Sequence, residues 1–395
     1  MTPRTRLRVA HVVTHPIQYF APLYRELSRR PVLELTVLFG WRQGAVPYWD
    51  EGFQTSFAWD TEVLSGYRYR FLTTSAGPGR VDRASAARKL FMQLKREPWD
   101  VVWIHGYSTP LSLAALVTCR LLHLPAIVRE EAQLLNPRTY WRRAAKAPVL
   151  RWLSGWIDAC YIGVSNYRFW RRYGLADARL HFTPYSVDNA FCQQRAKVFE
   201  GQKAELRAAF GLPTEYPVVL MVSKLQPHKN PGLLLDAFAE TQRHVPASLL
   251  FAGDGELRGE LETAIAQRSI ENCKIAGFLN QTQIARAYAA SDVLVLPSSY
   301  EPWGLVINEA MNFSLPIVAS DRVGCAPDLV RGGENGWVVP QGDARSLTTA
   351  LIQLLTDGQL RAQFGQASRS LVQSYSVERT ADGVVKAVMA ASAGK

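Results

Sequence analysis

Residues 292–320 constrain the fold of this chain more than any other stretch. An apolar run from Asp292 to Pro297 is typical of a buried strand, and Leu305 to Phe313 has the pattern of a helix. Pro302 and Gly304 mark the turn between them. The stretch therefore predicts a strand that passes through a tight turn directly into a helix.

The chemistry of this turn suits a phosphorylated ligand. A glycine just ahead of a helix lets the backbone approach a ligand closely, and the free N–H groups of the first helical turn attract negative charge. Glu301 and Glu309 bracket the turn with seven residues between them, and we expect both to face one cleft, as an acidic residue bound to a ribose diol would. The plainer alternative is an ordinary strand-helix unit with two solvated glutamates.

The string from Ser298 to Ser320 resembles the Glu-x7-Glu signature of the group 1 (family 4) glycosyltransferases, in which a strand like Leu315 to Ser320 follows. The resemblance implies the GT-B fold, an α/β architecture of two Rossmann-like domains whose parallel sheets face each other across a cleft. In that family the first domain holds the acceptor and the second holds the nucleotide sugar. We expect the first domain to comprise residues 1–195, completed by a C-terminal helix at about 377–395, and the second to comprise residues 196–376.

A second string in the later half carries two cations. Ser223-Lys224-Leu225 and the following residues to Asn230 resemble the family's gly-arg-leu-x-x-x-lys-gly string, with Lys224 at the arginine position and Lys229 at the lysine position. The resemblance implies that both bind the donor diphosphate. Fixed cations can supply the charge stabilisation that a metal supplies elsewhere, so we expect no metal and no cofactor. The alternative is a pair of surface lysines.

The resemblance assigns further residues to the donor site. The segment Ile275 to Leu279 resembles the one that contacts the donor's base. Asp254 and Glu256 follow a strand-like run but have no histidine or third carboxylate beside them, so we interpret them as a turn and not as a metal site. The predicted donor-binding residues are Ser223, Lys224, Lys229, Phe278, Leu279, Glu301, Trp303, Gly304, Leu305, Val306 and Glu309.

The chain begins with a predicted strand, Leu7 to Thr14, that breaks at His15-Pro16. We expect Ile17 to Leu27 to be the next helix, with Gln18 and Tyr19 in its first turn. The family commonly has a glycine-rich loop here, and this sequence lacks it. His15, Gln18 and Tyr19 are the predicted acceptor-binding residues, because such side chains hydrogen-bond sugar hydroxyls.

Two further predicted strands end in functional residue types. Val101 to Ile104 leads into His105, where ligands bind in open parallel sheets. By the resemblance, His105 contacts the transferred sugar and joins Lys224, Lys229 and Glu301 as the predicted catalytic set; the alternative is a structural histidine. Ala126 to Val128 leads into Arg129-Glu130-Glu131. Either Glu131 faces the acceptor, or the arginine forms an internal ion pair with a glutamate of this run.

Charge is divided unevenly along the chain. The net charge is +11, but residues 1–200 hold 28 Lys and Arg against 15 Asp and Glu, whereas residues 201–395 hold 17 against 19. Such a field attracts anionic partners, which include membrane headgroups, nucleic acid and acidic acceptors. Residues 138–156 interleave arginines with Trp141, Trp152 and Trp156. They predict either a membrane-docking surface or a helix whose tryptophans pack on its own sheet.

The remaining features bound the class of protein. Neither a membrane-spanning run nor a secretory signal is predicted, and the five scattered cysteines are typical of reduced cytosolic thiols. We therefore expect a cytoplasmic protein, peripheral at the inner membrane face through its positive first half. Long loops and a hairpin are expected from Gly40 to Ala76, and a linker between the domains is expected at Phe191 to Gly201.

Together these features predict a metal-independent, retaining glycosyltransferase of the hexosyl type. It would move a sugar from a UDP- or GDP-linked donor to a hydroxyl of a saccharide or lipid-linked acceptor, in cell-surface polysaccharide or glycolipid synthesis. The alternatives are a GT-B sugar-nucleotide epimerase, a phosphorylase, or a non-catalytic scaffold that binds membrane or nucleic acid. We expect no nucleic-acid partner, because both the lysines and the glutamates of the donor site are intact. A dehydrogenase is disfavoured, since no Gly-x-Gly-x-x-Gly follows the first strand.

Overall fold

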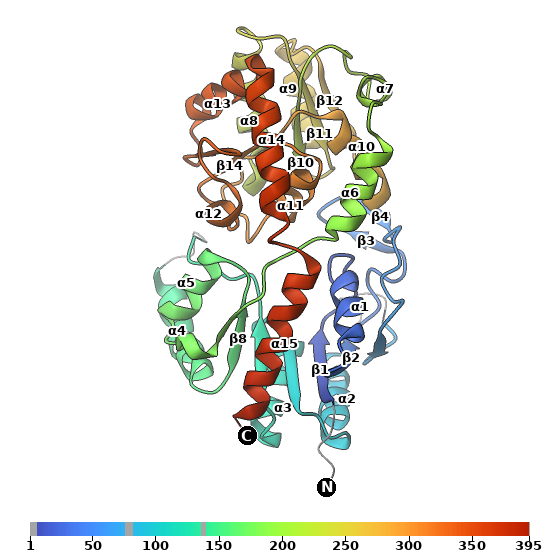
Figure 1. Cartoon of the computed structure of the whole chain (residues 1–395), viewed down its shortest axis with the longest axis vertical. Helices are drawn as coiled ribbons and strands as arrows, with labels where there is room; N and C mark the ends of the chain where they lie inside the picture. Colours follow the sequence, from blue (N-terminus) through green and yellow to red (C-terminus); the bar gives the residue numbers. More distant parts are fainter. Residues whose placement is uncertain (1–5, 76–81, 136–139, 395) are drawn as a thin grey trace. The chain divides into compact units, whose positions relative to one another are not determined.

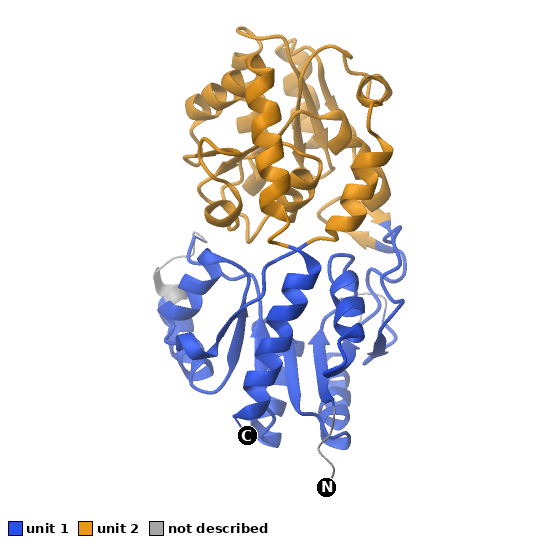
Figure 2. Ribbon diagram, viewed as in Figure 1, with its two compact units in different colours: residues 1–48, 57–186, 376–395 blue, residues 49–56, 187–375 orange. Residues whose placement is uncertain are grey.

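The computed structural model describes residues 6–75, 82–135 and 140–394, and of residues 140–143 the backbone alone. The chain forms two compact units, each built around its own parallel sheet (Figures 1 and 2). Unit 1 comprises residues 1–48, 57–186 and 376–395, and unit 2 comprises residues 49–56 and 187–375. The C-terminal helix therefore belongs to the same unit as the first strand.

Unit 1 contains a seven-stranded sheet in the order β5-β2-β1-β6-β7-β8-β9. Its paired strands are parallel, and β1 and β2 are apolar along most of their length because both faces of the sheet are covered. The strand order reverses between β1 and β6, which is where open α/β sheets bind ligands. The strands are β1 (Leu7–Val13), β2 (Leu33–Phe39), β5 (Arg68–Phe71), β6 (Val101–His105), β7 (Ala126–Arg129), β8 (Asp158–Tyr161) and β9 (Leu180–Phe182).

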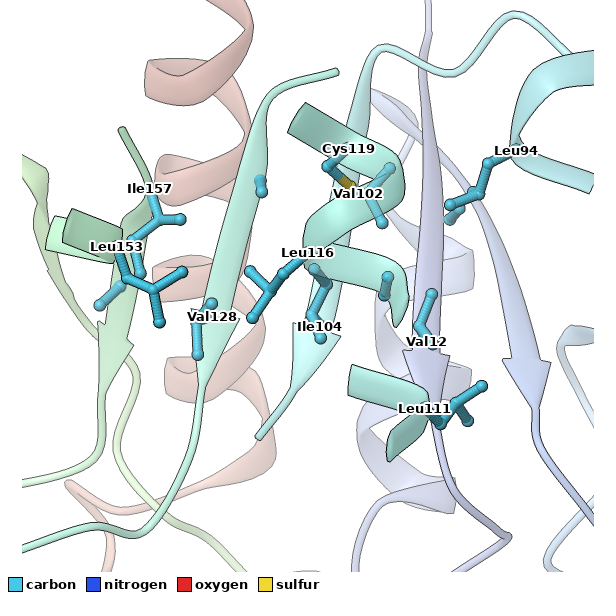
Figure 3. Close-up of a cluster of buried hydrophobic side chains, with 14 of the residues drawn as sticks. Val12, Leu94, Val102, Ile104, Leu111, Leu116, Cys119, Val128, Leu153 and Ile157 are labelled. Atoms are coloured by element: carbon cyan, nitrogen blue, oxygen red, sulfur yellow. The ribbon is translucent and has the colours of Figure 1, made fainter. Parts of the chain in front are cut away.

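Two layers of helices cover this sheet. On one face, α3 (Pro110–Leu122) places Leu111, Leu116 and Cys119 against β1, β6 and β7 (Figure 3). The helices α2 (Arg83–Arg96), α4 (Tyr140–Ser154) and α5 (Val164–Arg172) contribute to the same core. On the other face, α1 (Ala21–Arg29) packs beside α15 (Val377–Ala393) (Figure 1). A short turn, η2 (Asp177–Arg179), precedes β9.

Unit 2 repeats the same design with a six-stranded parallel sheet in the order β12-β11-β10-β13-β14-β15. The order reverses between β10 and β13. Its strands are β10 (Val218–Val222), β11 (Ser248–Ala252), β12 (Cys273–Ile275), β13 (Val293–Leu296), β14 (Ile317–Ser320) and β15 (Gly336–Val339). Its helices are α6 (Asn189–Val198), α7 (Lys203–Ala209), η3 (Pro227–Lys229), α8 (Pro231–Thr241), α9 (Arg258–Gln267), α10 (Gln281–Ala290), α11 (Leu305–Asn312), α12 (Ala326–Leu329), α13 (Ala344–Thr356) and α14 (Gly358–Val372).

The predicted α/β class with two Rossmann-like sheets is confirmed, and three local predictions are wrong. The helix expected from Ile17 begins only at Ala21, so Gln18 and Tyr19 lie in the preceding turns; Pro22 suits the first turn of a helix and fixes the later start. The linker expected at Phe191 to Gly201 is mostly helix α6. Asp188 caps that helix, because its carboxylate accepts a hydrogen bond from the backbone N–H of residue 191 at 2.9 Å.

The third correction concerns the segment from Gly40 to Ala76, which we expected to form long loops and a hairpin. The hairpin is present as β3 (Tyr48–Asp50) and β4 (Thr55–Phe57). However, β5 joins the main sheet beside β2, from Thr36↔Arg68 to Phe39↔Phe71. Three of the four residues of β5 are exposed, as befits the edge of a sheet, so its sequence lacks an apolar run.

Candidate active site

Two loops meet at the point in unit 2 where the strand order reverses. Lys224 lies in the loop that follows β10, and Glu301 lies in the loop that follows β13. The backbone N–H of Ser299 donates to the carbonyl of His228 at 2.8 Å, and the side-chain amide of Asn230 donates to the carbonyl of Pro297 at 3.2 Å. These bonds fix one loop against the other, so the predicted donor residues of both loops share one site.

Lys229 and Glu301 form an ion pair at this site, and each side chain is only 14% exposed. The loop after β14 holds Glu301 in place. The backbone N–H of Glu301 donates to the carbonyl of Arg322 at 3.2 Å, and the backbone N–H of Gly324 donates to the carbonyl of Glu301 at 2.9 Å. A short β-bridge to Val323 completes the support. The structure thus brings together two of the four predicted catalytic residues.

Lys224 contacts a segment that we did not assign to the site, the tip of the β3–β4 hairpin. Its ammonium donates to Asp50 Oδ1 at 2.7 Å and lies 4.6 Å from the ring centre of Phe53. Burial pushes the pKa of Asp50 upward, but the hydrogen bond and charge of Lys224 outweigh it, and the pKa lies below its ordinary value. Asp50 and Phe53 are site residues that sequence reasoning missed, since no motif marks them.

A glycine-rich turn after β11 supports the loop that carries Lys224. Gly253 has a φ of +155°, and a Cβ there would lie 1.8 Å from the carbonyl oxygen of Ser223, so only glycine fits. Next to it, the Asp254 carboxylate accepts a hydrogen bond from Arg258 at 2.7 Å. Among the residues that the structure describes, no group of histidines, cysteines and carboxylates could hold a metal ion.

The predicted turn before α11 places Gly304 in the left-handed region, with a φ of +101°. A Cβ on this glycine would lie 3.0 Å from Leu296. The side chain of Trp303 is 2% exposed, and its indole N–H donates to Asn308 at 3.0 Å. The turn therefore offers backbone groups, including the first N–H groups of α11 at Leu305 and Val306, which have no acceptor four residues earlier in the helix.

Glu309 lies within α11 and is 2% exposed. Its carboxylate accepts hydrogen bonds from Tyr288 at 2.7 Å and from Gln281 at 3.1 Å, both on α10. Gln281 follows closely on Phe278 and Leu279, the predicted base-contacting residues, and the Phe278 ring lies 4.8 Å from that of Phe53. The structure thus groups Glu309 with the predicted base segment, while Glu301 pairs with Lys229.

The corresponding reversal point of unit 1 brings together two predicted residues, His15 after β1 and His105 at the end of β6. Burial lowers the pKa of His105 to about 3, helped by the charge of Arg129 and by His15. Burial likewise lowers the pKa of His15 to about 4. Both imidazoles are therefore neutral near pH 7. Gln18 and Tyr19 lie in the same β1–α1 loop as His15.

The strand next to β6 delivers Arg129, which is 2% exposed. Its guanidinium packs on the rings of Phe20, at 5.6 Å, and Tyr185, at 4.8 Å. The hydroxyl of Tyr185 donates to Glu131 at 2.5 Å, and burial raises the pKa of Glu130 to about 8. Arg129 makes no ion pair with any described residue. The structure therefore does not show the internal Arg-Glu pair that was the alternative to an acceptor-facing Glu131.

One sequence model of a known family matches this chain within unit 2. The sequence model described as "Glycosyl transferases group 1" matches residues 202–371. Those residues belong to the group 1 glycosyltransferases. The match covers Lys224, Lys229, Glu301 and Glu309, and the family prediction is confirmed.

Curated relatives match over a similar length. The α-D-kanosaminyltransferase of Streptomyces kanamyceticus is 32% identical over 215 residues, which is 54% of this chain and 54% of the relative. The sulfoquinovosyl transferase SQD2 of Arabidopsis thaliana is 32% identical over 180 residues, 45% of this chain and 34% of the relative. The chain spans about half the length of the first of these relatives and less of the second.

Solved structures resemble the whole chain in fold. A sucrose-phosphate synthase from Thermosynechococcus elongatus has a TM-score of 0.72 and 19% identity, and the match covers 99% of this chain and 100% of that one. The Anabaena protein HepE, solved in complex with UDP and glucose, has a TM-score of 0.70 and 17% identity, with 96% and 99% covered. The predicted GT-B fold is confirmed, and the facing of the two sheets stays a prediction.

Proposed function

We propose that this protein transfers a sugar from a nucleoside-diphosphate sugar to a hydroxyl group of an acceptor. The observation that carries the proposal is the pair of ammonium groups, Lys224 and Lys229, at the reversal point of the unit 2 sheet, inside a region that belongs to the group 1 glycosyltransferases. Ligands bind at such a point in open parallel sheets. The names of curated relatives support the same chemistry, because they describe transferases of sugars such as kanosamine.

In the reaction, the bond between the sugar's anomeric carbon and the diphosphate breaks, and its electron pair leaves with the diphosphate. The acceptor oxygen bonds to that carbon, and its proton leaves toward the diphosphate. Negative charge grows on the leaving group, so the Lys224 and Lys229 ammonium groups stabilise the transition state more than the ground state. The N–H groups at the start of α11 add to this effect. Hence we propose that the enzyme needs no metal.

We propose the other donor contacts from the family resemblance. Glu309 binds the ribose hydroxyls, and Phe278 and Leu279 bind the base, which we propose to be that of a UDP- or GDP-linked sugar. Glu301, beside Lys229, contacts the donor sugar. Retention of the anomeric configuration is proposed from the family resemblance.

For unit 1 we propose an acceptor role. His105 contacts the transferred sugar as a neutral imidazole, which can donate and accept hydrogen bonds without adding charge. His15, Gln18, Tyr19 and Glu131 bind the acceptor, a saccharide or a lipid-linked saccharide of cell-surface polysaccharide or glycolipid synthesis. The proposed location is cytoplasmic.

A thermal-shift screen of nucleoside diphosphates and their sugars, in the presence of a chelator, tests the donor proposal. A ligand at a hundred times its Kd stabilises the native state by about 2.7 kcal/mol, so a matching nucleotide raises the Tm by several degrees. A response to one base and not the others, weakened in Lys229→Ala, supports the proposal. No response to any nucleotide sugar, or a response only after magnesium or manganese is restored, contradicts it.

A further inference from the structure

Three consecutive helices of unit 1 contain no acidic residue. The helices α2, α3 and α4 cover residues 83–96, 110–122 and 140–154, and none of these positions is Asp or Glu. All three pack their apolar sides into the core on the same face of the unit 1 sheet, and α2 contacts α3. The outer sides of these three helices lie on one face of the unit 1 sheet, and we call this surface the basic-apolar face.

Several basic side chains on this face are exposed and lack ion pairs within the described part of the chain. Seven are exposed and absent from every described salt bridge: Arg83, Arg88, Lys89, Lys95, Arg96, Arg120 and Arg151. The opposite face of the same sheet differs. There Arg30, at the end of α1, pairs with Glu26 at 3.0 Å and with Asp382 of α15 at 2.9 Å. Arg30 is thus paired on that face, whereas the seven cations of α2, α3 and α4 are in no described salt bridge.

Large apolar side chains are also exposed on the basic-apolar face. On α3, Leu113, Val117 and Leu121 are 45%, 54% and 64% exposed, and their spacing of four residues places them in one row along the helix. On α4, Val149 and Trp152 are each 53% exposed. Apolar side chains in a row beside unpaired cations are costly to leave in water and mark an interaction site.

We propose that the basic-apolar face docks on an anionic lipid surface, with the α3 row and Trp152 entering the headgroup region while the arginines and lysines contact lipid phosphates. Charge complementarity selects this partner, because helices without acidic residues that expose basic and apolar side chains together match a negatively charged interface in both charge and hydrophobicity. No helix of the described residues is both long enough and apolar enough to cross a bilayer. The proposal does not depend on the sugar donor or acceptor.

Flotation of the full chain with vesicles tests the proposal. We expect binding to phosphatidylcholine vesicles that contain 30% phosphatidylglycerol, little binding to phosphatidylcholine alone, and weaker binding as salt increases. Each basic residue near an anionic surface contributes about fivefold in affinity, so the triple variant Arg88→Gln, Lys89→Gln, Lys95→Gln should lose roughly a hundredfold. A matched triple variant elsewhere on the chain, Arg286→Gln, Arg345→Gln, Lys386→Gln, also removes three exposed cations and should bind as the unaltered protein does.

A second variant tests the apolar row. Val117→Ser with Leu121→Ser should weaken vesicle binding roughly thirtyfold and leave its salt dependence unchanged, because apolar burial is not screened. Both side chains are more than half exposed, so the fold should melt as before. Equal binding to neutral and anionic vesicles, no binding to either, or an equal loss in the two triple variants would overturn the proposal. A dimer that the serine variant dissociates would also overturn it, since a second copy of the chain would then cover this face.

Discussion

Removing the negative charge of Asp50 should strengthen donor binding. In the structure the Lys224 ammonium is already paired, at 2.7 Å, with the Asp50 carboxylate. A diphosphate that uses Lys224 must therefore displace or share this partner. Asp50→Asn is the suitable change, because its side-chain oxygen can still accept the N–H groups of Gly52 and Phe53, at 2.9 and 3.0 Å, and so keep the tip of the hairpin folded.

The size of this effect on the Kd depends on how exposed the Lys224 and Asp50 side chains are. Lys224 is 33% exposed and Asp50 is 14% exposed, so water screens their attraction in part. Ion pairs of this kind contribute about 0.2 to 1 kcal/mol, which corresponds to a factor of roughly 1.4 to 5 in the Kd of the donor. The cation–π contact with Phe53 survives the change. The gain should shrink as salt increases.

Calorimetric titration of the nucleoside diphosphate that the thermal-shift screen selects would measure this effect. At low salt the Kd of Asp50→Asn should be lower than that of the unaltered protein by a factor within that range. The same change made in the Lys224→Gln background should leave the Kd unaltered, because no ammonium remains to be released. An unchanged Kd in Asp50→Asn would show that the diphosphate does not use Lys224. A higher Kd in Asp50→Asn would show that Asp50 helps to bind the donor instead of competing with it.

Three further predictions concern stability. Gly253→Ala would force a Cβ against the Ser223 carbonyl and should lower the free energy of unfolding by roughly 2 to 4 kcal/mol in denaturant titrations. Gly259→Ala, in helix α9 with open space around it, is the control and should raise the free energy of unfolding by about 0.4 to 1 kcal/mol. Equal effects of the two changes would refute the steric argument. The pKa of His105 is about 3 in the folded protein against an ordinary value of 6.5, so its contribution to stability is complete above pH 6.5 and is lost as pH falls below that value, by about 1.4 kcal/mol per pH unit. Urea titrations from pH 7.5 to 4.5 should show a shallower loss of the free energy of unfolding in His105→Asn, and an identical slope would contradict the assignment of a neutral imidazole in the folded protein. Tyr288→Phe removes one donor from the buried carboxylate of α11 and should cost about 1.5 to 3 kcal/mol of stability measured by thermal unfolding, whereas a cost near zero would mean that this hydrogen bond is replaced.

Strands with both faces buried were predictable from the sequence. The run Leu33 to Phe39 forms β2 with the predicted bounds, and Asp292 to Pro297 contains β13. Buried parallel strands leave a continuous apolar run, and this signal is local. The edge strand β5 has the sequence Arg-Tyr-Arg-Phe, with mostly exposed residues, so no local pattern distinguishes it from a loop.

The site was predictable where one motif contains the functional residue. The loops of Lys229 and Glu301 are 72 residues apart in sequence but carry family strings, and the structure joins them in an ion pair. The contact of Asp50 with Lys224 spans 174 residues and belongs to no string, so only the folded chain reveals it. The basic-apolar face is a similar case, because composition shows the excess charge but only the packing of α2 and α3 shows where it lies.

The central claim is that Lys224 and Lys229 hold a diphosphate without a metal. The most direct test is calorimetric titration of the selected nucleoside diphosphate into chelator-treated protein, unaltered and with Lys229→Ala. The account predicts binding without added metal in the unaltered protein and a loss of roughly ten- to a hundredfold in the variant, because one charge-assisted contact of about 1.5 to 3 kcal/mol is removed. Binding that requires added magnesium or manganese, or that is equal in both proteins, would contradict it.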